Sequence, residues 1–397
     1  MKKAIIFLCA VVFFAACSDD ENAATDLKVT LETRNVTDAE SRFKVFITSN
    51  TSWKVSSTES WCTPLTLEKF GNDSLEIKVL QNDTYDERIA YVSVQAGDNT
   101  IITTVKVIQN PIGGNALRRN DSLVLVNFYE AYDGENWTDN TGWKTGNLDN
   151  WHGITVTDNR ITAIKFENNN LTGEFFSDFT GLDMFDTLSI ISEPGITGTI
   201  PTNITQLKNL KYLNITETSV SGEIIAELGD MENLEELIIS LNANITGNIP
   251  ATLGNITTLK KLILHNLPLT DESKIPIELG NLINLNYLSI TSCNLDGTIP
   301  TEVFNLSDLI YLSFSDNSLY GKIETDFENL TKLEILDLSG NDFSGKIPTT
   351  LESLTALKVL KLGNNHLEGK VPEGLTNSDV TLLICPQSKT FTNYICD

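Results

Sequence analysis

Apolar and polar residues alternate with a period of two in several short segments between residues 26 and 110. The segments are 27–31, 43–47, 75–79, 89–94 and 105–107, and Asn, Asp, Gly and Ser separate them. Such alternation is typical of strands that bury one face. Five strands within about 85 residues predict a small β-sandwich.

A longer pattern starts at residue 161 and continues to residue 376. Its unit is Leu-x-x-Leu-x-Leu-x-x-Asn-x-Leu-x-Gly-x-Ile-Pro, and its glycine recurs every 24 or 25 residues, with one interval of 50. That interval hides a further unit, in which Asp271 and Glu272 stand where the glycine is expected. Each unit has two apolar faces that only its neighbours can bury, so the units must stack. We therefore expect nine stacked repeats, with glycines at Gly173, Gly198, Gly222, Gly247, Gly297, Gly321, Gly345 and Gly369.

The unit resembles the leucine-rich repeat, and its Gly-x-Ile-Pro ending is similar to the plant-specific subclass. The resemblance implies an α/β solenoid with one short strand per repeat. The asparagines of the pattern are expected to satisfy backbone groups at a turn, with Thr218 and Cys293 as smaller polar substitutes. These asparagines are Asn169, Asn317, Asn341 and Asn365.

Residues 113–160 resemble the N-terminal cap of such arrays. Asp121 is expected to cap a helix that presents Leu123, Val126, Phe128 and Tyr129 to the core. Plant caps carry a cysteine pair that this segment lacks, so aromatic packing must replace the bridge.

Residues 377–397 are expected to form the C-terminal cap. Cys385 and Cys396 are close enough in the sequence to form a disulfide in an oxidising compartment. Cys62 and Cys293 would then remain free thiols.

Residues 26–112 contain landmarks of a second family. Trp53, Trp61, Gly71 and Arg88, with the closing segment 107–111, resemble the BACON domain, an immunoglobulin-like module. The resemblance implies either carbohydrate binding or a spacer. We expect Trp53 and Trp61 to lie in the core, because both stand beside strand starts, and we therefore favour the spacer.

The first residues predict export and anchoring. Residues 1–16 have the charged start and short apolar middle of a signal peptide. Cys17 follows Phe-Ala-Ala, which resembles a bacterial lipobox and implies lipid attachment at Cys17. The acidic tether at residues 17–25 resembles the export signal of lipoproteins in Bacteroidota-type bacteria. We expect a protein anchored by lipid in the outer membrane, on the cell surface.

Composition excludes several classes of function. The chain has 28 Lys and Arg against 53 Asp and Glu, a net charge of −25, which disfavours nucleic acid as a partner. Three histidines, His152, His265 and His366, are scattered, and no paired nucleophile and base, phosphate loop or metal-ligand cluster is present in the sequence. We expect no enzymatic activity, no cofactor and no metal.

The predicted strands leave one face for binding. Side chains alternate along a strand, so residues beside the paired leucines point away from the core. Tyr212, Tyr287 and Tyr311 share the position before the second leucine, and Lys261 holds it in another repeat. Tyrosine is typical of partner-binding surfaces, although it also serves simply to cover a sheet. With His265 nearby, these residues are the partner-binding candidates.

Charges on this predicted face nearly cancel. Six cations and eight acids give −2, so most of the acidity lies elsewhere. The cations are Lys165, Lys211, Lys260, Lys261, Lys358 and Lys361, and the acids are Glu167, Asp186, Glu217, Glu235, Glu236, Asp316, Glu334 and Asp337.

Three hypotheses for function follow. In the first, the face binds an unknown protein or glycoprotein in adhesion or envelope recognition. In the second, residues 26–112 bind polysaccharide as an accessory of glycan uptake. In the third, the protein is a structural component of the envelope without a ligand.

Overall fold

A computed structural model describes residues 26–83, 87–97, 101–110, 116–144, 148–158, 160–179 and 181–388. The lipid-attachment residue Cys17 and the disulfide candidate Cys396 lie outside the described residues. The chain divides after Pro111 into two compact units. Within the described ranges, no helix has both the length and the apolar character that crossing a bilayer requires.

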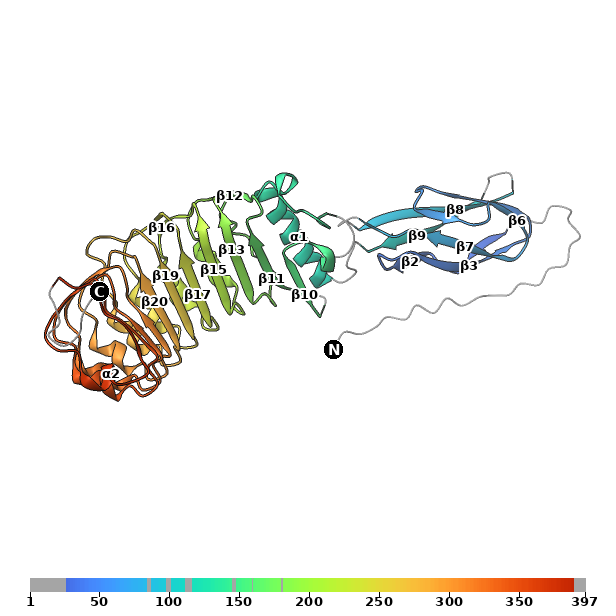
Figure 1. The fold of residues 1–397 in the computed structure, drawn as a ribbon. Coiled ribbons are helices and arrows are strands. Elements are labelled where there is room, and N and C mark those ends of the chain that lie inside the picture. The colour runs from blue at the N-terminus through green and yellow to red at the C-terminus, as the bar shows by residue number, and fades with distance from the viewer. Residues whose placement is uncertain are drawn as a thin grey trace, which may run out of the picture. The chain divides into compact units, whose positions relative to one another are not determined.

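The first unit is rich in strands, which form two sheets around one core (Figure 1). Val45, Ile77, Val92 and Val107 are fully buried in that core, and each alternates with more exposed neighbours. Four strands, at residues 33–36, 52–57, 62–64 and 68–70, were not among the segments that the sequence pattern predicted. One sheet has the order β1 (Leu27–Val29), β3 (Ser41–Ser49), β7 (Asp73–Val79), β5 (Cys62–Pro64), and the other β2 (Thr33–Val36), β9 (Ile101–Gln109), β8 (Arg88–Ala96), β4 (Ser52–Ser57), β6 (Glu68–Phe70).

The two tryptophans of the first unit contribute to its core. Trp53 is 1% exposed, and its indole N–H donates to the carbonyl of Gly71 at 2.8 Å. Trp61 packs partly buried against the same core, and the Arg88 guanidinium lies 4.3 Å from its ring centroid. The structural role expected for Trp53 is confirmed, and neither ring lies open as a sugar platform.

The second unit begins with helix α1 (Ala116–Ala131). The expectation that Asp121 caps this helix is wrong, because the helix starts five residues earlier. Asp121 is fully buried instead, pairs with Arg160 at 2.9 Å and accepts the backbone N–H of Ile161 at 3.0 Å. Leu123, expected in the core, is 40% exposed. The ion pair ties α1 to the strand of the first repeat, residues 160–167.

Aromatic rings fill the cap that follows, as expected from the missing cysteine pair. Trp143 lies 4.9 Å from Trp137 and 4.7 Å from Trp151, measured between ring centroids. Trp137 also lies 4.9 Å from Phe166 of the first repeat. The cap includes the short 3-10 helices η1 (Gly134–Asn136) and η2 (Leu148–Asn150). Aromatic packing therefore covers the open end of the array.

The repeats form one sheet of eleven strands (Figure 1). The first strand pairs antiparallel with the second, and all later pairs are parallel. Nine strands, β11 to β26, carry the nine Leu-x-Leu units. In order, the strands are β10 (Ile154–Thr157), β11 (Arg160–Glu167), β13 (Thr187–Glu193), β15 (Tyr212–Thr218), β17 (Glu236–Ser240), β19 (Lys261–His265), β20 (Tyr287–Thr291), β22 (Tyr311–Ser313), β24 (Ile335–Asp337), β26 (Val359–Lys361) and β28 (Thr381–Leu383).

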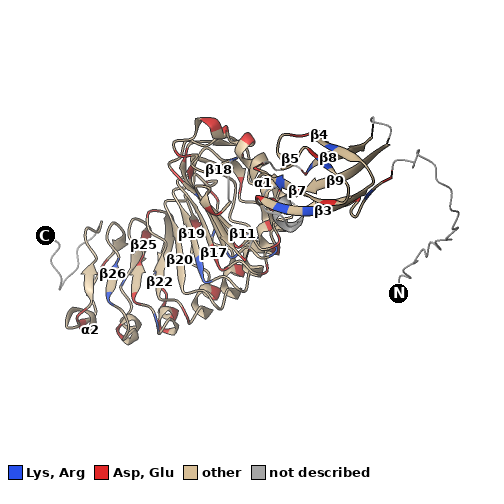
Figure 2. Ribbon diagram, turned by 90° about the vertical axis from the view of Figure 1, so that its right-hand side faces the viewer, with Lys and Arg blue, Asp and Glu red and all other residues tan. Residues whose placement is uncertain are grey.

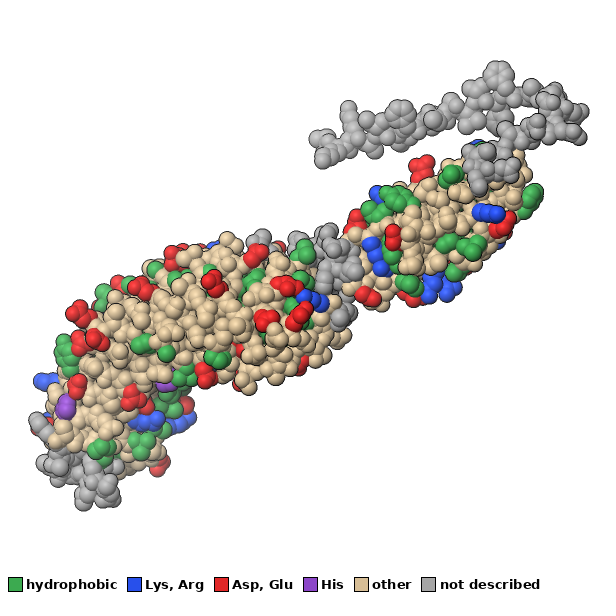
Figure 3. Space-filling view, turned by 90° about the horizontal axis from the view of Figure 1, so that it is seen from above, with side chains coloured by type: hydrophobic (Ala, Val, Ile, Leu, Met, Phe, Trp, Pro, Cys, Tyr) green, Lys and Arg blue, Asp and Glu red, His purple; other side chains and the backbone are tan. Residues whose placement is uncertain are grey.

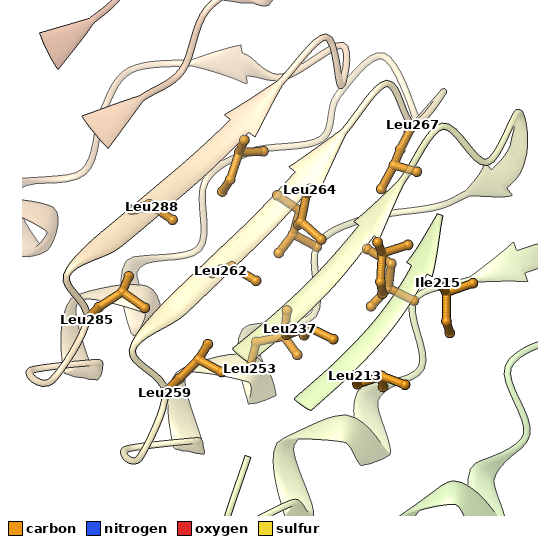
Figure 4. Close-up of a cluster of buried hydrophobic side chains, with 14 of the residues drawn as sticks. Leu213, Ile215, Leu237, Leu253, Leu259, Leu262, Leu264, Leu267, Leu285 and Leu288 are labelled. Atoms are coloured by element: carbon orange, nitrogen blue, oxygen red, sulfur yellow. The ribbon is translucent and has the colours of Figure 1, made fainter. Parts of the chain in front are cut away.

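Leucines of adjacent repeats stack behind this sheet. Leu237, Leu262 and Leu288 occupy matching positions on neighbouring strands and are fully buried (Figure 4). Eight short helices close the opposite edge of the repeats. They are η3 (Thr202–Gln206), η4 (Ala226–Asp230), η5 (Ala251–Asn255), η6 (Ile277–Asn281), η7 (Thr301–Asn305), η8 (Thr325–Asn329), η9 (Thr349–Ser353) and α2 (Glu373–Thr376).

A second set of short strands follows the turn of each repeat. It is interrupted between the second and third repeats, where only an isolated bridge joins Thr199 and Ser221, and again at the fifth repeat, where Asp271 and Glu272 replace the expected glycine. The three resulting sheets are β12 (Thr172–Glu174) with β14 (Gly195–Thr197), β16 (Ser221–Glu223) with β18 (Asn244–Thr246), and β21 (Asp296–Gly297), β23 (Ser318–Lys322), β25 (Asp342–Gly345), β27 (His366–Leu367).

The turn asparagines satisfy backbone groups as expected. The side-chain oxygen of Asn317 accepts the N–H groups of Cys293 and Leu295 at 2.9 and 3.1 Å, and its amide donates to the carbonyl of Ile290. Asn341 and Asn365 repeat this arrangement. These residues are structural.

Glu193 holds the same position in the second repeat. Its carboxylate is fully buried and accepts the N–H groups of Asn169 and Leu171 at 2.5 and 2.8 Å. Burial raises the pKa of Glu193, and the two N–H donors oppose that rise. The sequence pattern gave this residue no role.

The cysteines divide into two groups. Cys385 takes part in a disulfide, while its expected partner Cys396 lies outside the described residues. Cys62 and Cys293 are free and buried, as expected. Burial raises the pKa of both thiols to about 11, so they stay protonated at neutral pH and are poor nucleophiles.

Candidate functional site

We call the outward side chains of the eleven-stranded sheet the sheet face. On β19, Lys261, Ile263 and His265 lie on this face, while Leu262 and Leu264 between them are buried. The strand register places the residues before the second leucine in one column. Along the array this column reads Thr187, Tyr212, Glu236, Lys261, Tyr287, Tyr311, Ile335, Val359 and Thr381.

Tyr287 and Tyr311 form a stacked pair within the column. Their ring centroids lie 4.1 Å apart and their planes differ by 1°. The ammonium of Lys261 lies 5.5 Å from the Tyr287 centroid, within the range of a cation–π contact. Burial and the adjoining Tyr311 raise the pKa of Tyr287 to about 12, so its hydroxyl is neutral at physiological pH. The pair is a rigid apolar plate with polar tips.

Tyr212 lies apart from this plate. Its hydroxyl accepts the side-chain amide of Asn214 at 3.2 Å, and Thr216 donates to the other end of that amide. Thr216 also bonds the hydroxyl of Ser240 at 2.8 Å. Glu236 and Lys261 separate Tyr212 from Tyr287 in the column. The structure therefore splits the three tyrosines that the sequence grouped together.

His265 occupies the same face as Lys261, two residues further along β19. Its Nδ1 lies 2.8 Å from the hydroxyl of Thr291 on the next strand. The histidine therefore lies near the tyrosine plate but is already hydrogen-bonded.

Charged side chains on the sheet face pair with the repeat before them. The four pairs have N–O distances between 2.6 and 3.5 Å, and each joins neighbouring strands or strand starts. Exposed pairs of this kind contribute about 0.2–1 kcal/mol each to stability. Their main consequence here is a face without a strong field. The pairs are Glu235 with Lys260, Glu236 with Lys261, Glu334 with Lys358 and Asp337 with Lys361.

The second half of the face carries more apolar surface. Ile335 and Val359 continue the column beyond Tyr311, and Ile310 beside them is 45% exposed. Leu383 on the last strand is 51% exposed. A partner that meets the plate would therefore also meet aliphatic surface toward the C-terminal end.

Chemistry-bearing clusters are sparse. Among the described residues, no group of His, Cys, Asp and Glu could hold a metal ion. His366 lies 3.0 Å from Asp342 and 2.5 Å from the hydroxyl of Ser388, but all three side chains are exposed. Because water competes for each of these hydrogen bonds, we assign them no chemical role. They link adjacent turns of the array.

Family comparisons agree with this architecture. Residues 283–343 and 356–378 match models described as leucine-rich repeats. The chain carries leucine-rich repeats. Residues 51–110 match the BACON model, whose description is an N-terminal binding domain.

Two curated relatives share parts of the chain. A xyloglucan-specific endo-β-1,4-glucanase of Bacteroides ovatus, BoGH5A, is 33% identical over 147 residues, which cover 36% of this chain. Leucine-rich repeat protein FLOR 1 of Arabidopsis thaliana is 30% identical over 106 residues, which cover 26% of this chain. The matches span only 26% and 31% of those proteins.

Three solved structures with the same repeat fold are plant proteins. The ectodomain of the Arabidopsis thaliana receptor kinase GASSHO1/SCHENGEN3, in complex with CASPARIAN STRIP INTEGRITY FACTOR 2, aligns with a TM-score of 0.60 and 30% identity, over 66% of this chain and 32% of that one. The Arabidopsis HAESA ectodomain, in complex with an IDA peptide hormone, aligns with a TM-score of 0.58 and 25% identity, over 70% and 50%. A plant ice-binding protein aligns with a TM-score of 0.61 and 25% identity, over 68% and 87%.

Proposed function

We propose that the sheet face binds a protein or glycoprotein partner, with Tyr287 and Tyr311 as the anchor. The observation that carries this proposal is the stacked pair beside Lys261, on a face whose other charges are largely neutralised in pairs. Rigid aromatic side chains lose little entropy on binding and are common at the centres of interfaces. The HAESA ectodomain, which has the same repeat fold and is bound to a peptide hormone, supports a polypeptide ligand.

The shape of the plate favours a partner segment that crosses the strands. Tyr287, Tyr311, Ile335 and Val359 lie on four successive strands, spaced by about 4.8 Å each. An apolar side chain of the partner would cover the tyrosine rings, while their hydroxyls remain open to its backbone. Catalysis forms no part of this proposal.

The proposal includes a location. Cys17 carries the lipid anchor, the acidic segment that follows is a tether, and the BACON domain is a spacer on the outer-membrane surface. Mass spectrometry of the protein from its native cells tests the anchor, since the mature N-terminus should be an acylated Cys17. A mature chain that keeps residues 1–16, or that carries no acyl group, contradicts it.

The binding test begins with a photo-reactive residue in place of Ile335 on intact cells, which identifies the partner by cross-linking. The affinity of that purified partner is then measured for Y287A/Y311A and for Y212A. We expect the double variant to bind at least about tenfold more weakly, because a buried aromatic anchor contributes about 2 kcal/mol or more. Y212A, whose side chain is held in the polar network, should change affinity far less. Equal affinity of the wild type and the double variant contradicts the proposal.

A second candidate is glycan binding through the BACON domain. The relative that acts on xyloglucan favours it, and so does Phe70 on β6, which is 77% exposed. Tyr91 on β8 is 44% exposed. Affinity electrophoresis of the full chain in xyloglucan gels separates the two candidates. Glycan binding is favoured if xyloglucan slows the migration of the wild type and of Y287A/Y311A but not that of F70A/Y91A.

A further inference from the structure

A second surface lies on the flank of the array, apart from the sheet face. The residue directly after each repeat glycine forms a row along this flank. In the early repeats the row carries Glu174, Thr199 and Glu223, whereas the last three repeats carry Lys322, Lys346 and Lys370. Figure 3 shows acidic side chains spread over the array, and Figure 2 shows how few basic residues interrupt them. We call Lys322, Lys346 and Lys370 the lysine row.

The glycines hold the lysine stems in parallel. A Cβ built on Gly345 would lie 3.5 to 4.0 Å from three successive stem carbons of Lys322, and one on Gly369 would lie 3.2 to 3.6 Å from those of Lys346. Each stem therefore runs across the glycine of the next repeat. Both glycines have left-handed φ values of 83° and 93°, which side chains rarely adopt. The stems of Lys322 and Lys346 consequently take the same course in neighbouring repeats, which follow one another at about one strand spacing of 4.8 Å.

The lysine row differs from the other stacked lysines of the array. Lys260, Lys261, Lys358 and Lys361 each pair with an acid of the preceding repeat, and Lys332 pairs with Asp308 at 2.6 Å. Among the described residues, no acid pairs with Lys322, Lys346 or Lys370. These three lysines hold the same position in successive repeats, so each is next to another lysine. Like charges stacked in this way repel, and an anion lying across them relieves the repulsion.

The surroundings of the row point to a sugar. Tyr320 is 50% exposed and stands two residues before Lys322 on the same strand, so both exposed side chains lie on one side of that strand. Aromatic faces stack on the apolar faces of sugar rings. Ser344, which registers with Lys322, adds a hydroxyl. The acids nearest in sequence are Glu324, Asp342 and Glu368, of which Asp342 faces His366.

An open groove precedes the row on the same flank. It has a volume of about 730 Å³ and is lined by Asn248, Lys274, Pro276 and Asp296, with Glu272 and Glu278. Three acids, Glu272, Glu278 and Asp296, line this groove together with one lysine, so the anionic part of a ligand would lie over the lysine row rather than in the groove.

We infer that the lysine row binds an acidic polysaccharide, with uronate carboxylates on Lys322, Lys346 and Lys370 and a sugar ring on Tyr320. One strand spacing is close to the length of one sugar ring in an extended chain, so the lysine row and a polysaccharide lying along it have comparable repeat lengths. The net charge of −25 repels every polyanion over long distances, so binding depends on the local contacts of the lysine row with carboxylates and of Tyr320 with a sugar ring. This site is independent of partner binding on the sheet face.

The test measures binding of the purified full chain to polygalacturonic acid at about 0.15 M salt, where charges beyond about 8 Å are screened. K322Q/K346Q/K370Q should weaken binding by about tenfold, because each exposed pair contributes modestly. K332Q/K358Q/K361Q removes the same charge from paired lysines and should change affinity by less than about twofold. Y320A should weaken binding of the polysaccharide without changing folding.

Ligand controls decide the class of anion. Carboxyl-reduced polygalacturonic acid keeps the sugar rings and should not bind, while polyglutamate and duplex DNA keep the charge and should bind much more weakly. The inference fails if the wild type does not bind polygalacturonic acid, if both triple variants lose affinity equally, or if polyglutamate or DNA binds as tightly. Should the triple variant lower the melting temperature, K346Q alone is expected to weaken binding by about threefold, and no change there also contradicts the inference. Loss of partner binding in Y287A/Y311A would not alter polysaccharide binding by the lysine row, so the two proposals can fail separately.

Discussion

The two halves of the array use one backbone plan with different side chains. In the first half, up to β17, the turns are held by mixed residue types, among them Glu193 and Asn242, and Tyr212, Asn214 and Thr216 hydrogen-bond one another on the sheet face. In the second half, from β20 onward, Asn317, Asn341 and Asn365 hold successive turns and Tyr287 stacks on Tyr311. Polar side chains that already hydrogen-bond one another gain little free energy from a partner, whereas exposed aromatic rings gain free energy when a partner removes water from them. Position in the array therefore decides which tyrosine is available.

The largest effect is expected in the asparagine ladder of the second half. N341A leaves the N–H of Leu319 without its acceptor and removes donors from the carbonyls of Phe314 and Leu338. We expect the free energy of unfolding to fall by about 3 kcal/mol, because these groups are buried. T218A, at the matching position of the first half, should lower it by about 1 kcal/mol. Urea unfolding measures both, and equal losses would remove the distinction between the halves.

A smaller effect is expected at Glu193. Its pKa is raised in the folded state, so the ionised form is disfavoured there. Stability linked to this group is fully present below the unfolded pKa of about 4.3 and is lost as pH rises through the folded pKa. E193Q removes this titration. The stability of the wild type relative to E193Q should therefore fall between acidic and neutral pH, as thermal unfolding at several pH values would measure, and a constant difference would contradict the assignment.

The smallest effect is a titration on the plate itself. Burial and Tyr311 raise the pKa of Tyr287 to about 12, so removal of the Tyr311 ring should lower it toward the ordinary value of about 10. Difference absorbance of tyrosinate in Y311A, compared with Y212A as the control, measures the shift. An unchanged titration of Tyr287 would mean that the rings do not interact in solution.

Several features of the array were predictable from the sequence. The 24-residue period required stacking, and the asparagines at the turns were correctly assigned to the backbone. The aromatic packing of the cap followed from the missing cysteines. These predictions succeeded because each depends on residues that recur in every unit or on a residue type that has a single structural role at its position.

Other features needed the fold. Asp121 precedes an apolar stretch and so resembled a cap, but its partner Arg160 is 39 residues away. Glu193 breaks the asparagine pattern, and only its burial against two backbone donors reveals its use. Three strands of the first unit that the pattern missed, β2, β5 and β6, have only three or four residues, too few for a period to show. The fourth, β4, alternates buried Trp53 and Val55 with exposed neighbours, and the sequence prediction overlooked it.

The sequence by itself determined the periodic plan, because a repeat that cannot bury its own apolar faces admits only stacking. It also determined which residue type occupies each position of the column on the sheet face. Only the tertiary structure decided which of those residues touch, since contact between Tyr287 and Tyr311, or between Lys260 and Glu235, joins strands more than twenty residues apart. The exposure and the contacts of each side chain depend on the adjacent repeats, so they cannot be read from the sequence of one repeat alone.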